Sequence, residues 1–287
     1  LAKVTPSDPT AVPLGKGKYT VVLCEDGTIL DDTFYFKLAE DKFYVIPNAG
    51  RNVAVAEQIS KHTVGVKVQD VTKEWAILAL QGPKARDVLA AASVSPAPKF
   101  HHIINMELAG IFCMVSGTGY TGEKGVELYV PAHGARRVWD HLLKVGAAHG
   151  IKPIGLGARD TLRLEKGYCL AGNEFEGGRT PFEANLDWTM DWKSDFLGKE
   201  RLLKQKDEPT TDRLVGLVQE KGIPRHGYPI ERTGTDAGKV TSGTLSPTTG
   251  KGIALGYVRG GAGVGEPFEV VVREKRMPAT VAKLPFV

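Results

Sequence analysis

Cysteine is scarce in this sequence, and its spacing excludes several kinds of protein. The 287 residues include three cysteines, Cys24, Cys113 and Cys169, and no C-x-x-C pair. An odd number of widely spaced cysteines argues against a disulfide framework or a cysteine-rich zinc site, and it fits a reducing compartment. The seven histidines show no H-E-x-x-H spacing. We therefore predict a cytoplasmic protein with no metal site.

Long runs of a single residue class are missing as well. The 37 Lys and Arg and 33 Asp and Glu give a net charge of +4 without a long basic run, which argues against nucleic-acid binding. No apolar stretch reaches the length of a membrane span, and the first residues show no signal-peptide pattern. We therefore predict neither a nucleic-acid partner nor a membrane partner.

What is present indicates an α+β region followed by an all-β region. Residues 18–36 predict a hairpin, and residues 74–92 predict a strand followed by a helix. Residues 41–62 and 124–145 share the order strand, proline, glycine, arginine, helix, which is either a weak internal repeat or chance reuse of a common turn. We interpret the charged stretch 202–213 as a linker. The short glycine-punctuated strands after it predict a small β-barrel or sandwich.

One glycine-rich motif has the sequence pattern of a nucleotide-binding site. Residues 117–122 read G-T-G-Y-T-G, which is formally G-x-G-x-x-G. The dinucleotide fingerprint requires a strand before the motif and a helix after it. Here a second β-rich run follows, so the motif is predicted to be a connection between strands.

Two adjacent acids interrupt an apolar strand. Alternation turns Asp31 and Asp32 to opposite faces, which argues against one metal ion held by both. Asp32 shares its face with Leu30, Phe34 and Phe36, the more apolar set. A carboxylate on such a face is expected to be partly desolvated, with a raised pKa. Asp32 is therefore the candidate base or charge partner.

Two other charged positions leave two interpretations open. Glu127 lies in an alternating strand, and is either a solvent-facing glutamate or a carboxylate that accepts hydrogen bonds from a pterin or guanine ring. Arg159 begins a series with Asp160, Arg163 and Glu165. That series is either a ladder of helix-surface ion pairs or includes a guanidinium that meets a carboxylate or a polar ring edge.

Several segments together resemble one family, the aminomethyltransferase or T-protein of the glycine cleavage system. The segments, in family order, are CEDGTILDD, QGPKA, TGYTGEKGVELYV, GLGARDTLRLEKGYCLAGNE, TPFEANLDW, FLGKE, GKVTSGTLSPTTGKGIALGYV and KLPFV. They cover nearly the whole chain, and GLGARDTLRLE together with SGTLSPTTGKGIALGYV is a specific combination. The family's opening segment, with its DVSHMG-like motif, is not matched, so we expect part of the first lobe to be missing.

The resemblance implies a fold and an activity. The expected fold is α+β and of cloverleaf shape: two α+β lobes with antiparallel sheets and helices, and a C-terminal β-barrel, around a central folate channel. Residues 1–205 would form the folate-binding region of two intertwined lobes, and residues 206–287 the barrel. The implied enzyme uses tetrahydrofolate in one-carbon metabolism and glycine catabolism. It would move the aminomethyl group from the lipoyl arm of its partner, H-protein, to this small-molecule folate and release ammonia.

The resemblance also assigns site residues. Asp32, the second acid of the pair, would lie by the reacting pterin nitrogens, where it orients the ring, acts as a base and stabilises positive charge. Glu127 would pair with the aminopyrimidine edge of the pterin. The implied folate-binding residues are Tyr120, Glu127, Arg159, Asn48, Tyr19 and Trp188.

Two other functions remain open on sequence grounds. One is a folate-dependent demethylase of the same fold that acts on a small methylated amine or sulfonium compound. The other is a folate-binding protein that supports iron–sulfur assembly, whose signature resembles K-G-C-Y-x-G-Q-E. Residues 166–174 read K-G-Y-C-L-A-G-N-E, with tyrosine and cysteine exchanged, which favours the transferase.

Overall fold

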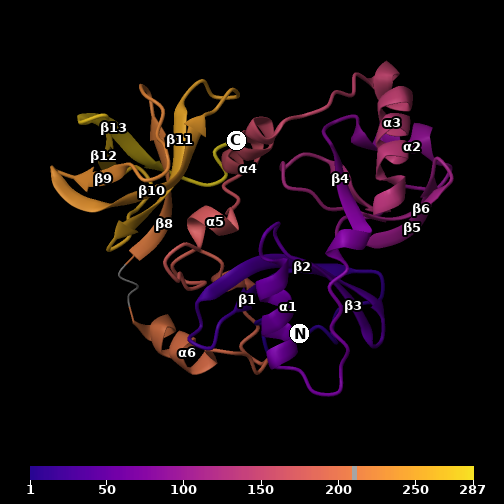
Figure 1. Cartoon of the computed structure of the whole chain (residues 1–287). Helices are drawn as coiled ribbons and strands as arrows, with labels where there is room; N and C mark the ends of the chain where they lie inside the picture. The colour runs from indigo at the N-terminus through magenta and orange to yellow at the C-terminus, as the bar shows by residue number, and fades with distance from the viewer. Residues whose placement is uncertain (209–211) are drawn as a thin grey trace. The chain divides into compact units, whose positions relative to one another are not determined.

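The computed structural model describes residues 1–208 and 212–287 (Figure 1). The chain divides into two compact units. The first contains Leu1, Asp8–Thr20 and Thr33–Leu156, and the second contains Ala2–Ser7, Val21–Asp32 and Gly157–Val287. The division passes through the predicted hairpin twice, so each of its strands carries residues of both units.

The hairpin opens a three-stranded sheet. Strands β1 (Gly17–Leu23), β2 (Ile29–Ala39) and β3 (Lys42–Ile46) lie in the order β1-β2-β3. In the turn between β1 and β2, Gly27 has a φ of 79°, a left-handed conformation that favours glycine. The Asp26 carboxylate accepts a hydrogen bond from the backbone N–H of Thr28 at 3.0 Å. Helix α1 (Asn52–Lys61) follows β3, and the predicted hairpin is confirmed.

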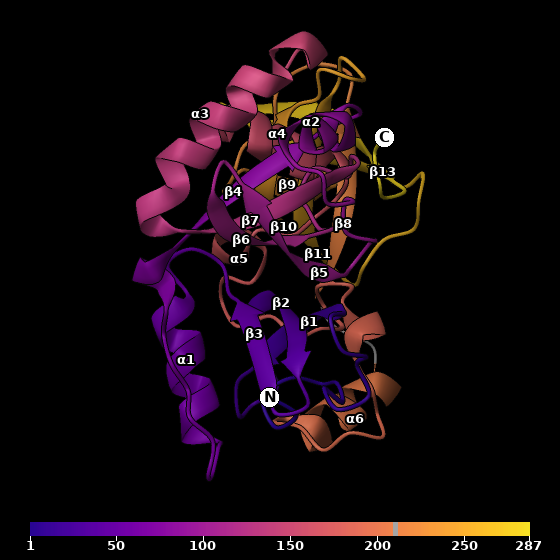
Figure 2. The ribbon, with the colours of Figure 1, turned by 90° about the vertical axis from the view of Figure 1, so that its right-hand side faces the viewer.

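The second sheet lies wholly in the first unit. Its strands β4 (Trp75–Gln81), β5 (Ile103–Leu108), β6 (Ile111–Ser116) and β7 (Gly125–Pro131) form an antiparallel sheet in the order β4-β7-β6-β5. Helices α2 (Ala85–Ala92) and α3 (Ala135–Gly146) pack on one of its faces (Figure 1 and Figure 2). Alternation along β7 sends Val126, Leu128 and Val130 into this core, and Glu127 and Tyr129 to the opposite face.

The end of the chain closes into a barrel in the second unit (Figure 1). Its strands are β8 (Asp212–Gln219), β9 (Pro229–Arg232), β10 (Thr235–Leu245), β11 (Gly252–Arg259), β12 (Pro267–Val272) and β13 (Lys275–Ala282). They close in the order β10-β11-β8-β13-β12-β9. Closure pairs every edge strand, and the core of the barrel includes Leu217, Ile230, Val240, Phe268 and Val270.

The remaining helices connect these sheets. They are α4 (Leu156–Glu165), α5 (Ala171–Glu174) and α6 (Lys199–Asp207). Short 3-10 turns occupy Thr72–Glu74 (η1), Ala132–Gly134 (η2), Ala147–His149 (η3) and Asp187–Thr189 (η4). Among the described residues, no helix combines the length and apolar character that crossing a bilayer requires.

The predicted class, α+β with a C-terminal barrel, is confirmed, whereas the linker interpretation of residues 202–213 needs correction. Residues 202–207 belong to α6, and β8 begins at Asp212; residues 209–211 lie outside the described part. Helix α6 has one fully buried side chain, Leu202, which packs against the Gly27 turn. A single buried residue produces no apolar period, which explains why the helix escaped prediction.

Candidate functional site

Both acids of the Asp31–Asp32 pair are buried in β2. Asp31 is 0% exposed and Asp32 is 9% exposed. Asp32 is thus largely withdrawn from solvent, as expected of a partly desolvated carboxylate, and Asp31 is buried as well because its face also buries Ile29, Thr33 and Tyr35. A group that touches a ligand needs an accessible edge, and Asp32 is the acid that retains one.

Asp32 shares its surroundings with a buried thiol. Burial raises the pKa of Cys169 well above its usual range, and the negative charges of Glu174 and Asp32 raise it further. The positive charge of Arg163 acts in the opposite direction. Asp32 therefore lies within electrostatic reach of a buried charged cluster in the second unit.

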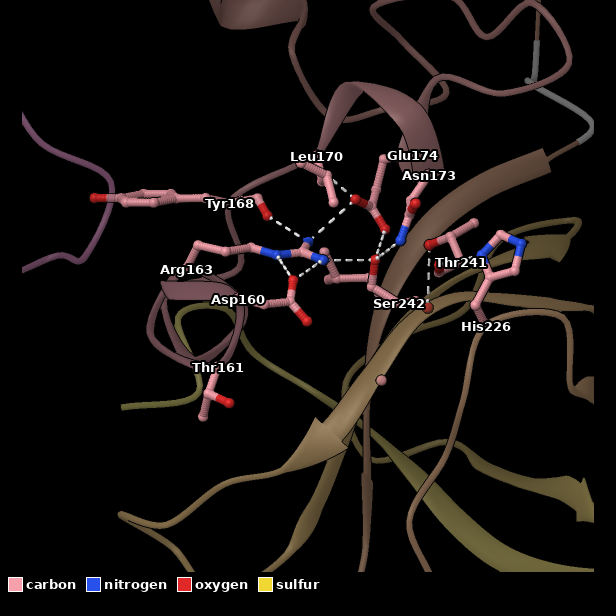
Figure 3. A network of polar contacts seen from close by, with 12 residues as sticks. Asp160, Thr161, Arg163, Tyr168, Leu170, Asn173, Glu174, His226, Thr241 and Ser242 are labelled. Carbon is pink, nitrogen blue, oxygen red and sulfur yellow. Dashed lines mark hydrogen bonds and ion pairs between the residues drawn. The ribbon is translucent and has the colours of Figure 1, made fainter. Parts of the chain in front are cut away.

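Arg163 lies at the centre of this cluster (Figure 3). Its side chain is 1% exposed. Its Nε donates to Asp160 Oδ1 at 2.8 Å, and its Nη1 donates to the carbonyl of Tyr168 at 3.0 Å. Its Nη1 also donates to Glu174 Oε2 at 3.1 Å, and its Nη2 donates to Ser242 Oγ at 2.8 Å. All three guanidinium nitrogens are thus satisfied, as a buried arginine requires.

Glu174 completes the same cluster from α5. Its side chain is 0% exposed, and it accepts hydrogen bonds from the backbone N–H of Leu170 at 2.7 Å and from Ser242 Oγ at 2.6 Å. Asn173 Nδ2 donates to the same Ser242 oxygen at 3.0 Å. Ser242 lies on β10, so the cluster ties α4 and α5 to a barrel strand (Figure 3).

A second acid of α4 is anchored to the barrel in the same way. Glu165 is 3% exposed and accepts a hydrogen bond from Ser246 Oγ. It also accepts from the backbone N–H of Thr248 at 3.2 Å and from its hydroxyl at 3.1 Å. The interpretation of this helix as a ladder of surface ion pairs is therefore wrong for Arg163 and Glu165. The sequence signal was the joint occurrence of GLGARDTLRLE and SGTLSPTTGKG, the two segments that these bonds join.

Two further predicted residues of the second unit lie at its surface. Arg159 is exposed in the first turn of α4. Trp188 is 66% exposed in the short turn η4. Asp32, Arg159 and Trp188 thus belong to the same unit but differ strongly in burial.

Glu127 is one of the four predicted residues of the first unit. It is half-buried on β7, and its carboxylate accepts a hydrogen bond from Thr118 Oγ1. Ser116 Oγ hydrogen-bonds to the same threonine hydroxyl and, at 3.2 Å, to Tyr129 OH. Burial raises the pKa of Tyr129, and the charge of Glu127 raises it further. Glu127 is therefore an aligned carboxylate beside a buried phenol, and the interpretation as a simple solvent-facing residue is wrong.

The other three predicted residues of the first unit are all half-buried. Tyr120 lies in the glycine-rich segment between β6 and β7, Tyr19 on β1, and Asn48 in the connection between β3 and α1. The carbonyl of Asn48 accepts a hydrogen bond from the N–H of Arg51 at 2.9 Å. The glycine motif joins two strands, as predicted, and no helix follows it.

The structure thus divides the predicted site residues between the units. Tyr19, Asn48, Tyr120 and Glu127 belong to the first, and Asp32, Arg159 and Trp188 to the second. Within residues 1–208 and 212–287, no group of three or more His, Cys, Asp or Glu side chains is placed to hold a metal ion. The predicted residues carry carboxylate, phenol and guanidinium groups. Such groups are suited to hydrogen-bonding a polar heterocycle and to proton transfer.

The comparisons with known proteins agree with this fold. The GCVT N-terminal domain family matches residues 1–194, and the glycine cleavage T-protein C-terminal barrel domain family matches residues 213–287. The chain therefore belongs to the glycine cleavage T-protein family.

Individual relatives are named more narrowly. The aminomethyltransferase of Halothermothrix orenii is 41% identical to this chain over 297 aligned residues, which cover 100% of the chain and 82% of that protein. The aminomethyltransferase of Bacillus subtilis is 37% identical over 100% of the chain and 81% of that protein. A crystal structure of the glycine cleavage system aminomethyltransferase T from Bartonella henselae has a TM-score of 0.90 at 32% identity, over 100% of this chain and 80% of that one. The prediction of an aminomethyltransferase is confirmed.

Proposed function

We propose that this chain transfers the aminomethyl group carried by the lipoyl arm of H-protein to tetrahydrofolate. The products are methylene-tetrahydrofolate, ammonia and dihydrolipoyl H-protein. The observation that carries this proposal is the family match, which covers both the α+β region and the barrel. The relatives at 37 to 41% identity are named aminomethyltransferases, so neither the demethylase nor the iron–sulfur alternative is favoured.

Asp32 is the proposed catalytic residue. Transfer of the one-carbon unit requires a carbon centre that becomes electron-poor as ammonia leaves, and a folate nitrogen that gives up its proton after attack. A carboxylate can accept that proton and stabilise the positive charge. At 9% exposure, Asp32 is shielded enough for its charge to act strongly, and it keeps an edge through which to act.

Glu127 is the proposed contact for the aminopyrimidine edge of the pterin. That edge presents a ring N–H and an amino group, and a carboxylate accepts hydrogen bonds from both. The Thr118 hydroxyl donates to Glu127 Oε2, which orients the carboxylate before a ligand arrives. The further proposed folate-binding residues are Tyr120, Arg159, Asn48, Tyr19 and Trp188.

We propose two further properties along with this activity. Residues 1–205 form the folate-binding region and residues 206–287 the barrel domain, which is supported by the gap between the two family matches at residues 194 and 213. The protein works in the cytoplasm, which is supported by its cysteines. All three of them lie within the described residues and none forms a disulfide.

Ammonia release tests the proposal directly. The purified chain is mixed with tetrahydrofolate and H-protein loaded with the aminomethyl group, and both ammonia and methylene-tetrahydrofolate are measured. The proposal predicts formation of both products in equal amounts, and none when loaded H-protein is omitted. Parallel reactions replace H-protein with small methylated amines or sulfonium compounds. Turnover only in these reactions would establish the demethylase and overturn the proposal.

A further inference from the structure

The glycine-rich segment 117–124 wraps around one side chain of the neighbouring strand, that of Gln81 at the end of β4. Gln81 Nε2 donates to the carbonyl of Thr118 at 3.2 Å and to the carbonyl of Val126 at 2.9 Å. Gln81 Oε1 accepts a hydrogen bond from Thr121 Oγ1 at 3.1 Å. One amide therefore holds the beginning and the middle of the segment, together with the strand β7 that follows it.

We propose that Gln81 is a positioning residue for folate recognition: it fixes the segment that carries Tyr120 and aligns the carboxylate of Glu127. This inference rests on the proposed function, because it deepens the role given there to these two residues. Gln81 itself has no part in the chemistry. Its effect passes through the main chain of its neighbours.

The amide group is suited to this position by its chemistry. Two of the three contacts require a donor, because they are made to backbone carbonyls, and the third requires an acceptor for a threonine hydroxyl. A glutamine side chain supplies two N–H donors and a carbonyl oxygen on the same planar group. A carboxylate at this position would face two carbonyl oxygens without a proton to donate, and a methionine would make none of the three bonds.

The two glycines beside the amide show how closely the segment packs on it. A Cβ added to Gly119 would lie 2.0 Å from Gln81 Oε1, and a Cβ added to Gly125 would lie 2.5 Å from Gln81 Cδ. Neither glycine has a positive φ. A side chain at either position would therefore displace the Gln81 amide, whereas the backbone itself is not left-handed there.

Thr118 links the amide to the carboxylate. Its carbonyl is bound by Gln81, and its hydroxyl donates to Glu127. Val126, the second carbonyl held by Gln81, is the residue directly before Glu127. Gln81 thus fixes the main chain on both sides of the Thr118–Glu127 hydrogen bond, so its loss should release the hydroxyl that orients the carboxylate.

The ends of the segment are held independently of this amide. The N–H of Gly117 donates to the carbonyl of His102 at 2.9 Å, and the N–H of Gly82 donates to the carbonyl of Lys124 at 2.8 Å. Replacing the Gln81 side chain should therefore loosen the middle of the segment while leaving the sheet and both ends in place.

The first test is the Gln81→Met variant in the full chain. It should weaken tetrahydrofolate binding by about tenfold or more, seen as a rise in both the KM and the Kd for tetrahydrofolate, because a displaced recognition group loses its contact with the ligand. KM for loaded H-protein should be unchanged. A purely structural role would reduce the amount of active enzyme without shifting the folate KM alone.

The matched control is Gln219→Met, which replaces a fully buried glutamine of the barrel strand β8 and should leave the folate KM unchanged. Equal folate KM values in Gln81→Met and the wild-type chain would overturn the inference.

A second pair of variants approaches the same contact from the segment. Gly119→Ala should weaken folate binding, because its methyl group displaces the Gln81 amide from its present position. The double variant Gln81→Ala/Gly119→Ala should bind folate no more weakly than Gln81→Ala alone, because the shortened side chain leaves room for the methyl group. Gly155→Ala is the control, since an added Cβ there meets no atom within 4 Å. Additive losses in the double variant would contradict the inference.

A measurement on the unliganded chain tests this inference separately from the proposed function. Hydrogen exchange on the unliganded chain should show faster exchange at the amides of residues 118–123 in Gln81→Met, with α2 unchanged. A wild-type chain that fails to bind tetrahydrofolate would overturn the proposed function. Unchanged exchange in residues 118–123 would overturn the positioning role, whatever the chain binds.

Discussion

Replacing Glu174 by glutamine should strongly destabilise the protein. Its carboxylate is completely buried and accepts hydrogen bonds from Arg163, from the Leu170 backbone and from Ser242. Glu174→Gln keeps the shape but removes the negative charge, and it places an NH2 group where the structure supplies donors. The Arg163 guanidinium, 1% exposed, is then left without its buried counter-charge.

The size of the loss in stability depends on how well the remaining partners of Arg163 balance its charge. Removing one partner of a buried ion pair costs about 3–5 kcal/mol. Arg163 keeps its bond to Asp160 at 2.8 Å, but that carboxylate is half exposed, so it compensates in part and the lower value applies. A loss of about 3 kcal/mol is a large part of the total stability of a typical protein. It corresponds to a decrease in Tm of about 5 °C in a chain of this size.

Urea and thermal unfolding, followed by tryptophan fluorescence, measure this loss. The control is Asp140→Asn, which breaks the exposed i,i+4 pair between Arg136 and Asp140 (2.7 Å) and should cost less than about 0.5 kcal/mol. The double variant Arg163→Met/Glu174→Gln should cost less than the sum of its parts, because the unpaired charge is gone. A Glu174→Gln variant within about 1 kcal/mol of the wild-type chain would refute the reasoning.

Two further predictions concern titratable groups. Burial raises the pKa of Cys113 to about 11 and that of Cys169 well above its usual range. Only about one in a thousand Cys113 thiols is then ionised at pH 8, so iodoacetamide should modify Cys24 in the native protein and the other two only after unfolding. Mass spectrometry of the labelled peptides checks this, and early labelling of Cys169 would contradict it. Burial, and then the charge of Lys16, lower the pKa of His101 below its usual value of 6.5. The folded state therefore binds fewer protons than the unfolded state, and this contribution to stability is present above pH 6.5 and is lost as the pH falls. His101→Gln should flatten the fall in the urea midpoint between pH 7 and pH 5, and an unchanged slope would exclude this residue as its source.

Local pattern predicted those parts of the fold whose cause is local. The hairpin at Gly27, the strand–helix order along 74–92 and the glycine-punctuated barrel strands all follow from alternation and turn residues close in sequence. Helix α6 did not follow, because Leu202 is its only buried residue and most of its other residues are charged. A helix with one buried side chain leaves no periodic apolar signal.

The candidate site shows the same division between local and distant causes. Alternation predicted that Asp31 and Asp32 face apart, but the burial of each face depends on segments elsewhere in the chain, so alternation did not reveal that Asp31 is completely buried as well. The burial of Arg163 and Glu165 depends on Ser242 and Ser246, about eighty positions later. No helical period can reveal such partners, and only the joint occurrence of the two motifs indicated them.

The role of Asp32 is the central claim, and one comparison of variants tests it most directly. Turnover of aminomethyl-loaded H-protein and affinity for tetrahydrofolate are measured for the wild-type chain, Asp32→Asn and Asp31→Asn. Loss of a positioned base lowers kcat by about 10²–10⁴-fold. Asp32→Asn should therefore lose turnover on that scale and keep its folate affinity within a few-fold. Asp31→Asn, at a completely buried position, should lower stability while the folded enzyme keeps most of its turnover. Equal losses of turnover in the two variants, or normal turnover in Asp32→Asn, would contradict the assignment.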